Sequence, residues 1–260
     1  MAEAALVLPE LAGPARVVRA VSTVVLQVGE CAVKVHPPGT DPLHLTRVHA
    51  VLSDSPVALT AVAVPVVTSH GVVTVTPWTA PAPPLSWGAV GEALRSLHDL
   101  PTAGALPSWT PLRRLPAQLL DLPEAQARTL LDRRSALLDR LADLEPVLPP
   151  GALHGDVAPD IVLTTPSGPR WIDLDFACLG MREYDVAAVV RRYAAGELSD
   201  ADYRAFVHAY EVDLRGWPGL ALLDALCALS GTGFHLWADR CAGRPSPWLA
   251  DVLSEVPGAR

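Results

Sequence analysis

The valine-rich N-terminal third of this sequence, and the change of pattern after it, most restrict how the chain can fold. Short β-branched runs separated by turn residues predict strands at 15–21, 23–29, 31–36, 57–67 and 71–78. Between the third and fourth runs, "DPLHLTRVHAVLSD" predicts a helix over 41–54, with Asp41 as N-cap and Pro42 at its first position. The expected order is β-β-β-α-β-β.

A stiff connector follows this β-rich part. Residues 76–86, "TPWTAPAPPLS", are rich in proline. Beyond the connector, apolar residues recur at helical spacing over 86–100, 124–145, 182–195, 199–213 and 219–241. A β-hairpin is expected over 160–176, around the turn "PSGP". The sequence therefore predicts an α+β chain with a small β-rich lobe over 1–80 and a larger helical lobe over 81–260, whose helical part starts at residue 86.

Charge and composition exclude several classes of protein. The 260 residues carry a net charge of −8, which argues against nucleic-acid binding through a basic face. The N-terminus lacks the basic start of a signal peptide, and the apolar runs are expected to break before the roughly 18 residues of a membrane span. The four cysteines form no C-x-x-C pair, which favours free thiols in a reducing cytoplasm.

Lys34 is the single lysine among 20 lysine and arginine residues. Where arginine replaces lysine almost everywhere, a remaining lysine indicates a need for a compact ammonium group. Lys34 lies in "AVKV", at the end of the third expected strand. From there, its side chain could bind nucleotide phosphates as a point charge; the alternative is an ordinary lysine in water.

One aspartate lies in the loop before the predicted hairpin, and another lies at the end of its second strand. Asp156 follows His154 and Gly155 in "LHGDVAPDIVL", and Asp173 ends the second strand in "WIDLDF". One strand, one turn and one strand fit between them, so the hairpin brings both carboxylates to the same edge. A base, a Mg²⁺ ligand and a phosphate-binding lysine are what phosphoryl transfer requires. Loop caps are the alternative role for the two aspartates.

These motifs, together with "VTPW" and "ALRSLHDLP", resemble the aminoglycoside phosphotransferase/choline kinase-like family over residues of about 14 to 240. The resemblance implies a bilobal protein-kinase-like fold and an ATP- and Mg²⁺-dependent kinase that acts on a hydroxyl of a small molecule. It implies that Asp156 is the catalytic base and Asp173 the metal-binding aspartate. It further implies that Lys34 contacts the phosphates, that Trp78 lies at the hinge facing the adenine, and that Asp185 caps or braces the helix below the loop.

The sequence departs from the family pattern in three places. Ile161 occupies the usual position of a metal-binding asparagine, and a loop shortened by one residue would put Asp160 there instead. The helix over 41–54 has no acid between its first and last residues, so Lys34 is expected to lack its usual ion pair. The first β-turn has no glycine, which leaves Ser22 as a candidate phosphate contact.

Two further features leave alternatives open. Asp175 points away from the site if the strand continues to it, and inward, as a metal ligand or substrate contact, if the strand has ended. The acidic run over 196–213 is a solvated helix face or the wall of a site for a cationic acceptor. The leading hypothesis is an ATP- and Mg²⁺-dependent small-molecule phosphotransferase; the alternative is a catalytically impaired pseudokinase that binds a nucleotide or a partner.

Overall fold

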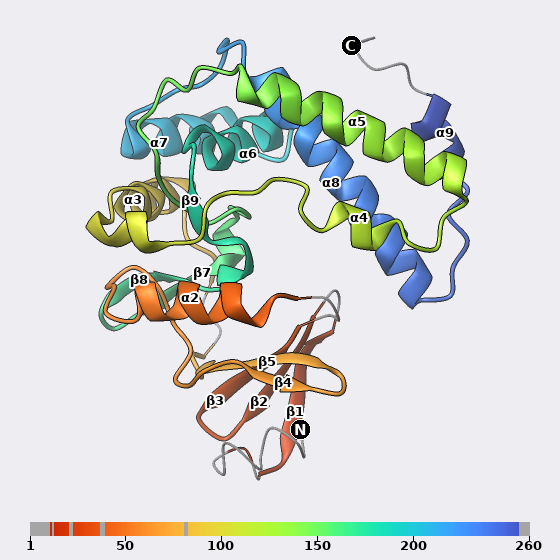
Figure 1. Cartoon of the computed structure of the whole chain (residues 1–260). Helices are drawn as coiled ribbons and strands as arrows, with labels where there is room; N and C mark the ends of the chain where they lie inside the picture. The colour runs from red at the N-terminus through yellow and green to blue at the C-terminus, as the bar shows by residue number, and fades with distance from the viewer. Residues whose placement is uncertain (1–10, 12, 21–22, 37–39, 81–82, 255–260) are drawn as a thin grey trace. The chain divides into compact units, whose positions relative to one another are not determined.

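The computed structural model describes residues 11, 13–20, 23–36, 40–80 and 83–254 (Figure 1). The chain forms two compact units. The first contains Met1–Trp109 and Leu148–Asp213, and the second contains Thr110–Val147 and Leu214–Arg260. The lobe boundary near residue 80 remains a prediction.

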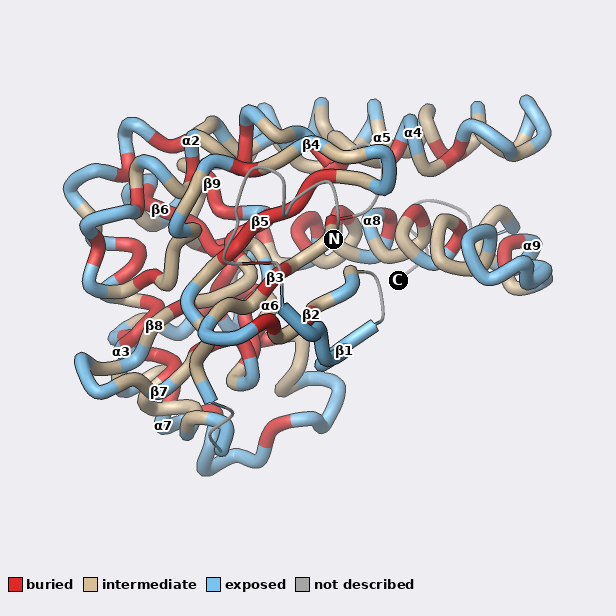
Figure 2. The backbone as a smooth tube through the Cα atoms, turned by 90° about the horizontal axis from the view of Figure 1, so that it is seen from below, coloured by how far each residue is buried: buried red, intermediate tan, exposed pale blue. Residues whose placement is uncertain are grey.

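The first unit begins with a five-stranded antiparallel sheet in the order β1-β2-β3-β5-β4. The strands are β1 Ala15–Ala20, β2 Val24–Val28, β3 Cys31–Val35, β4 Val66–Thr68 and β5 Gly71–Pro77. Figure 2 shows the exposed edge strand β1 and the mostly buried β5. The short expected strands are confirmed.

One strand is much shorter than expected. The apolar run over 57–67 predicts a strand along its whole length, but β4 begins only at Val66. Pro65 cannot donate a backbone hydrogen bond to a neighbouring strand. The earlier part of the run instead pairs at Ala58 with Trp171 and leaves Val62 and Val64 exposed.

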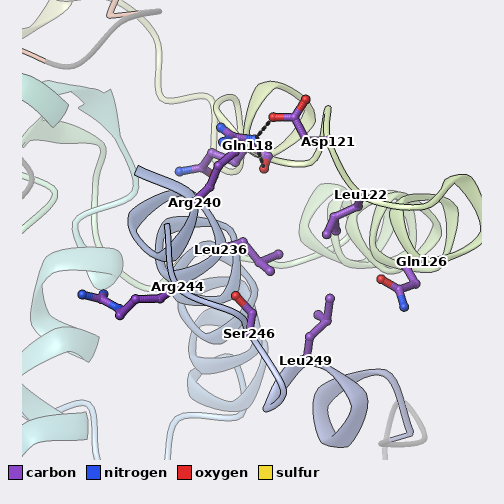
Figure 3. A pocket seen from close by; sticks show the side chains of 9 residues that line it. All are labelled: Gln118, Asp121, Leu122, Gln126, Leu236, Arg240, Arg244, Ser246 and Leu249. Atoms are coloured by element: carbon purple, nitrogen blue, oxygen red, sulfur yellow. Dashed lines mark hydrogen bonds and ion pairs between the residues drawn. The ribbon is translucent and has the colours of Figure 1, made fainter. Parts of the chain in front are cut away.

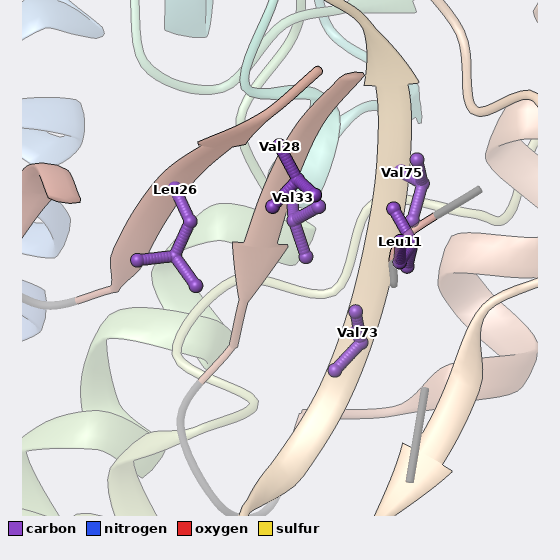
Figure 4. Packing of buried hydrophobic residues seen from close by; sticks show 6 residues of the cluster. All are labelled: Leu11, Leu26, Val28, Val33, Val73 and Val75. Atoms are coloured by element: carbon purple, nitrogen blue, oxygen red, sulfur yellow. The ribbon is translucent and has the colours of Figure 1, made fainter. Parts of the chain in front are cut away.

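Side chains on the two faces of the sheet have different roles. A buried cluster covers one face (Figure 4) and consists of Leu11, Leu26, Val28, Val33, Val73 and Val75. Successive strand residues point to opposite faces, so Lys34 and its cross-strand neighbour Thr74 lie on the other face. The valine alternation thus fixes the face from which Lys34 projects.

Helix α2, Pro42–Leu52, follows the sheet as expected. The Asp41 side chain accepts a hydrogen bond from the backbone N–H of Leu43 at 2.9 Å, which is an N-cap. The helix buries Leu45, Val48 and Leu52, at the apolar spacing that predicted it.

The remainder of the first unit combines helices with two small β-pairs. Strand β6 pairs with β9 and β7 pairs with β8. Helix α3 packs against α7, and Gly91 allows the close approach, because a Cβ there would lie 2.8 Å from the Phe206 carbonyl oxygen. The elements are α3 Trp87–His98, η2 Pro101–Ala105, β6 Gly151–Leu153, η3 Pro159–Ile161, β7 Val162–Thr165, β8 Gly168–Trp171, η4 Leu174–Phe176, β9 Cys178–Gly180, α6 Glu183–Ala194 and α7 Asp200–Tyr210.

The second unit is helical. It contains α4 Leu115–Gln118, α5 Glu124–Ala142, α8 Leu220–Cys241 and α9 Leu249–Ser254. Helix α8 packs against α4 and α5. A hollow of about 360 Å³ lies among these helices (Figure 3), with Leu122, Leu236 and Leu249 on its wall and Arg240 paired with Asp121 at 2.8 Å.

Helix α8 has 22 residues and, by length and composition only, is apolar enough to cross a membrane, although it contains Asp224, Asp239 and Arg240. Asp224 and Asp239 do interrupt the apolar run, as expected from the sequence. Core helices of folded units share this length and composition, and α8 buries Leu222, Leu223, Leu226 and Leu229. Length alone does not assign it to a membrane.

Candidate active site

Asp156 lies on a tight loop that follows β6. Gly155 has φ +86°, a conformation that glycine adopts readily. A Cβ at this position would lie 2.6 Å from the Cβ of Phe176. Glycine is therefore required both by the backbone and by the neighbouring segment, which carries Asp173 and Asp175.

His154 fixes the shape of this loop from within. Its Nδ1 accepts a hydrogen bond from the backbone N–H of Asp156 at 3.3 Å, so Nε2 carries the proton and donates to the carbonyl oxygen of Ile172 at 2.8 Å. His154 is fully buried. The imidazole thus joins the loop directly to the residue before Asp173.

Asp185, for which the resemblance implied a structural role in the helix below the loop, braces the loop itself from the start of α6. Its carboxylate accepts hydrogen bonds from the backbone N–H groups of His154 at 2.7 Å and Gly155 at 2.8 Å. The Nε2 atom of His98 is 3.1 Å from the same carboxylate, and Nδ1 of His98 is 2.7 Å from the hydroxyl of Tyr210. Asp185 is only 1% exposed.

Replacing Asp185 by alanine is expected to destabilise the protein by about 3 kcal/mol, because it leaves two buried backbone N–H groups without an acceptor. Chemical denaturation measures this change. Asp54→Ala, at an exposed turn position, is the matched control and should shift the unfolding free energy by less than about 0.5 kcal/mol. Equal effects of both substitutions would contradict the bracing role.

Lys34 meets two carboxylates from the segment after β8. Its Nζ forms ion pairs with Oδ1 of Asp173 and, at 2.9 Å, with Oδ1 of Asp175. Strand β8 ends at Trp171, so Asp175 points inward, which was one of the two alternatives. Asp173 has φ +61°, in the left-handed region that aspartate tolerates better than most residues.

Asp175 is also held by His36, which Thr74 supports in turn, and neither residue was predicted from the sequence. Oδ2 of Asp175 is 3.0 Å from Nδ1 of His36, and Nε2 of His36 is 2.8 Å from the hydroxyl of Thr74. Burial would raise the pKa of Asp175, but the hydrogen bond from His36 and the charge of Lys34 outweigh it and hold that pKa below its usual range. Asp175 is therefore an ionised, buried carboxylate.

As expected, α2 supplies no acidic partner for Lys34, and its ion-pair partners come from residues 173–175. Helix α2 instead contributes His49, whose Nδ1 accepts a hydrogen bond from the backbone N–H of Ala61 at 3.1 Å. Burial, opposed by the charge of Asp175, lowers the pKa of His49 to about 4. His49 is neutral at pH 7 and does not repel Lys34.

The candidate metal ligands are not all brought together. Asp173 and Asp175 share Lys34, whereas Asp160 is exposed and borders a small hollow with Pro83 and Pro84. Ile161 is buried at 5% exposure and is bonded through its backbone to Ala158 and Ile172. Within the described ranges, no group of three His, Cys, Asp or Glu side chains is arranged to hold a metal ion.

Asp156 lies within electrostatic range of Asp173. Although Asp156 is exposed, neighbouring protein atoms displace part of its water, and this desolvation raises the pKa of its carboxyl. The electrostatic interaction with His154 opposes that increase, while the Asp173 carboxylate adds to it. The hairpin therefore brings the two acids together, as predicted from the spacing.

The structure says less about the two remaining candidate nucleotide contacts, Trp78 and Ser22. Trp78 is half-buried, its backbone N–H donates to the carbonyl oxygen of Glu30 at 2.7 Å, and the Arg16 guanidinium lies 6.0 Å from the centre of its ring. A role for Trp78 beside an adenine remains a prediction. Ser22 lies outside the described residues.

Solved structures of similar fold cover nearly the whole chain. The choline kinase LicA from Streptococcus pneumoniae has a TM-score of 0.67 and 15% identity, over 96% of this chain and 94% of that chain. A choline/ethanolamine kinase family protein from Mesorhizobium loti has a TM-score of 0.63 and 19% identity, over 98% and 94%. An aminoglycoside-3'-phosphotransferase of type VIII has a TM-score of 0.58 and 22% identity, over 83% and 93%.

These similarities confirm the expected α+β, protein-kinase-like fold, with an N-terminal antiparallel sheet and a larger helical C-terminal part. No curated protein matches the chain in sequence. The model of the phosphotransferase enzyme family (APH) matches residues 20–223. The chain therefore belongs to the phosphotransferase enzyme family.

Proposed function

We propose that this protein transfers the γ-phosphoryl group of ATP to a hydroxyl group of a small molecule, with the help of Mg²⁺. The observation that carries the proposal is the convergence of one ammonium and two carboxylates, Lys34 with Asp173 and Asp175, near the loop that bears Asp156. Phosphoryl transfer depends mainly on positioning and on charge stabilisation. These residues supply both kinds of group.

Lys34 is suited to hold nucleotide phosphates. Its side chain is 15% exposed, so its charge is partly shielded from water and its ammonium can still be reached. Two proteins of similar fold are described in complex with AMP and with AMP-PNP and Ca²⁺. We extend nucleotide binding to this chain on that likeness and on the position of Lys34.

The residues fit a magnesium ion in part. Asp173 is 30% exposed and offers hard carboxylate oxygens, while the more buried Asp175 adds negative charge beside it. A bound Mg²⁺ ion would neutralise charge on the phosphates. Asp173 is the ligand that we propose, and Asp160, from its exposed turn, is the candidate replacement for the missing asparagine.

Asp156 would orient the acceptor hydroxyl and accept its proton. Hydrogen bonds to His154, and from His154 and Gly155 to Asp185, keep the loop rigid. A base held in this way loses little entropy when the acceptor binds. The acceptor is a small molecule, and the acidic run over 196–213 favours a cationic one. We place the reaction in the cytoplasm, where ATP is available.

A second function is favoured by one observation. Ile161 is buried at the position where the family usually has a metal-binding asparagine, and it cannot bind a cation. A protein that binds a nucleotide without transferring phosphate would have such a site. Thermal unfolding with ATP, with and without Mg²⁺, detects binding in either case, so turnover must separate the two functions.

The deciding experiment measures ADP formation by the purified chain with ATP, Mg²⁺ and a panel of amino sugars and amino alcohols. The proposal predicts acceptor-dependent ADP release that the Asp156→Asn variant lacks. ATP-induced stabilisation without turnover on any acceptor would favour the nucleotide-binding alternative. If ATP neither stabilises the protein nor is turned over, both functions are contradicted.

Activity should fall on the acid side at a higher pH than an ordinary aspartate would give. Asp156 acts as a base only when ionised, and desolvation raises its pKa above the usual value of about 3.9. As pH falls through this raised pKa, kcat/KM should drop in proportion to the ionised fraction. A profile that stays flat down to the ordinary aspartate range would contradict the assignment.

A further inference from the structure

Asp175 is the most firmly held carboxylate beside Lys34. One of its oxygens lies 2.9 Å from Nζ of Lys34, and the other lies 3.0 Å from Nδ1 of His36. The other ring nitrogen of His36 lies 2.8 Å from the Thr74 hydroxyl. The side chain of Asp175 is 9% exposed and that of His36 is 1% exposed, so water competes little for these contacts.

The three supporting residues come from one face of the sheet. His36 directly follows β3, and its contact with the Thr74 hydroxyl places its ring on the side of the sheet that carries Lys34. Thr74 is the cross-strand neighbour of Lys34 on β5. The sheet thus presents a lysine, a histidine and a threonine as a rigid set. The segment after β8 supplies the carboxylate that Lys34 and His36 bind, and Thr74 holds His36.

This arrangement replaces a partner that α2 does not provide. In protein kinases, an ion pair with a glutamate of a neighbouring helix positions the phosphate-binding lysine. Residues 42–53 contain no acid. The ion pairs that Lys34 makes within the described residues are with Asp173 and Asp175.

We propose that His36 and Thr74 are positioning residues, which fix Asp175 as the permanent partner of Lys34 and so orient its ammonium towards the nucleotide phosphates. This inference rests on the proposed function. The inference assigns different roles to the carboxylates of Asp173 and Asp175. Asp173, which is more exposed, is available for another ligand, whereas Asp175 stays with Lys34.

The single lysine allows a test that does not depend on turnover. Acylation by an amine-reactive reagent, followed by peptide mass spectrometry, reports on Lys34 alone among the side chains, because the α-amino group lies in a different peptide. A lysine whose ammonium is held between two carboxylates reacts slowly, because these contacts keep its nitrogen from the reagent. We expect His36→Leu to increase the acylation rate of Lys34 by about tenfold.

The same variant should lower kcat by about tenfold or more if His36 positions Lys34, because misplaced reacting groups reduce the rate of transfer. His36→Asn keeps a hydrogen-bond donor near the position of Nδ1 and should restore most of both effects. Val33→Ala is the matched control. It removes buried volume from the opposite face of β3, lowers the melting temperature and should leave the acylation rate nearly unchanged.

Different results would contradict the positioning role of His36 and the proposed phosphotransferase function. If wild-type protein shows no turnover but His36→Leu exposes Lys34 to acylation, the positioning network stands and the proposed function fails. If wild-type protein turns over and His36→Leu matches Val33→Ala in acylation rate and in kcat, the positioning role of His36 is wrong. Equal effects of His36→Asn and His36→Leu would also overturn it.

Discussion

Replacing Asp156 by asparagine is expected to lower kcat by about a thousandfold and to change the affinity for ATP by less than about twofold. Asparagine keeps the size of the side chain but cannot accept the proton of the acceptor hydroxyl. The loop itself should persist, because its backbone is held through His154, Gly155 and Asp185. Steady-state ADP release and ATP-dependent thermal stabilisation measure the two quantities.

Asp54→Asn is the control for this prediction. Asp54 is exposed in a turn after α2, and its substitution should leave kcat within about twofold of wild type. If Asp156→Asn retained more than about a tenth of wild-type kcat, Asp156 would not be the base. If it lost ATP affinity to the same extent as kcat, a general disturbance of the site would explain the loss.

Lys34→Arg is expected to lower kcat/KM by about a hundredfold or more, although it conserves the charge. Nζ of Lys34 pairs with both Asp173 and Asp175, and the lysine side chain is only 15% exposed. A planar guanidinium is larger and places its donors in a fixed fork, so it cannot occupy the position of a single ammonium. Kinetics with varied ATP measure the change.

The Lys34→Met variant tests the charge of the side chain separately from its length and shape. It removes the cation beside the buried carboxylate of Asp175, which should destabilise the fold by about 3 kcal/mol. Arg128→Lys is the matched control, because Arg128 pairs with Glu124 on the exposed surface of α5. This exchange should leave activity and stability unchanged. Full activity in Lys34→Arg would contradict the phosphate-binding role of Lys34.

Local chemistry made part of this structure predictable from sequence. The N-cap at Asp41, the short valine-rich strands and the hairpin after Asp156 each depend on near neighbours in the chain. The single lysine pointed to Lys34, and the spacing of 17 residues between Asp156 and Asp173 predicted their approach. A structural role for Asp185 came from the family resemblance alone, and its hydrogen bonds to the loop backbone were not predicted.

Contacts between distant residues were not predictable in this way. His36 and Asp175 are 139 residues apart, and no local rule pairs them. The alternation of β3, continued by one residue, places His36 on the same face as Lys34, which was a signal available in the sequence. The absence of an acid in α2 correctly predicted that this helix gives Lys34 no partner, but no local rule pointed to its partners in the segment after β8.

The central claim is that Lys34 and its two carboxylates form a nucleotide site. Labelling the chain with [ε-¹⁵N]lysine gives a single side-chain signal, since Lys34 is the only lysine. Titration with a non-hydrolysable ATP analogue and Mg²⁺ should move this signal saturably, and Asp173→Asn should abolish the dependence on Mg²⁺. A wild-type signal that stays unchanged at millimolar nucleotide would contradict the claim.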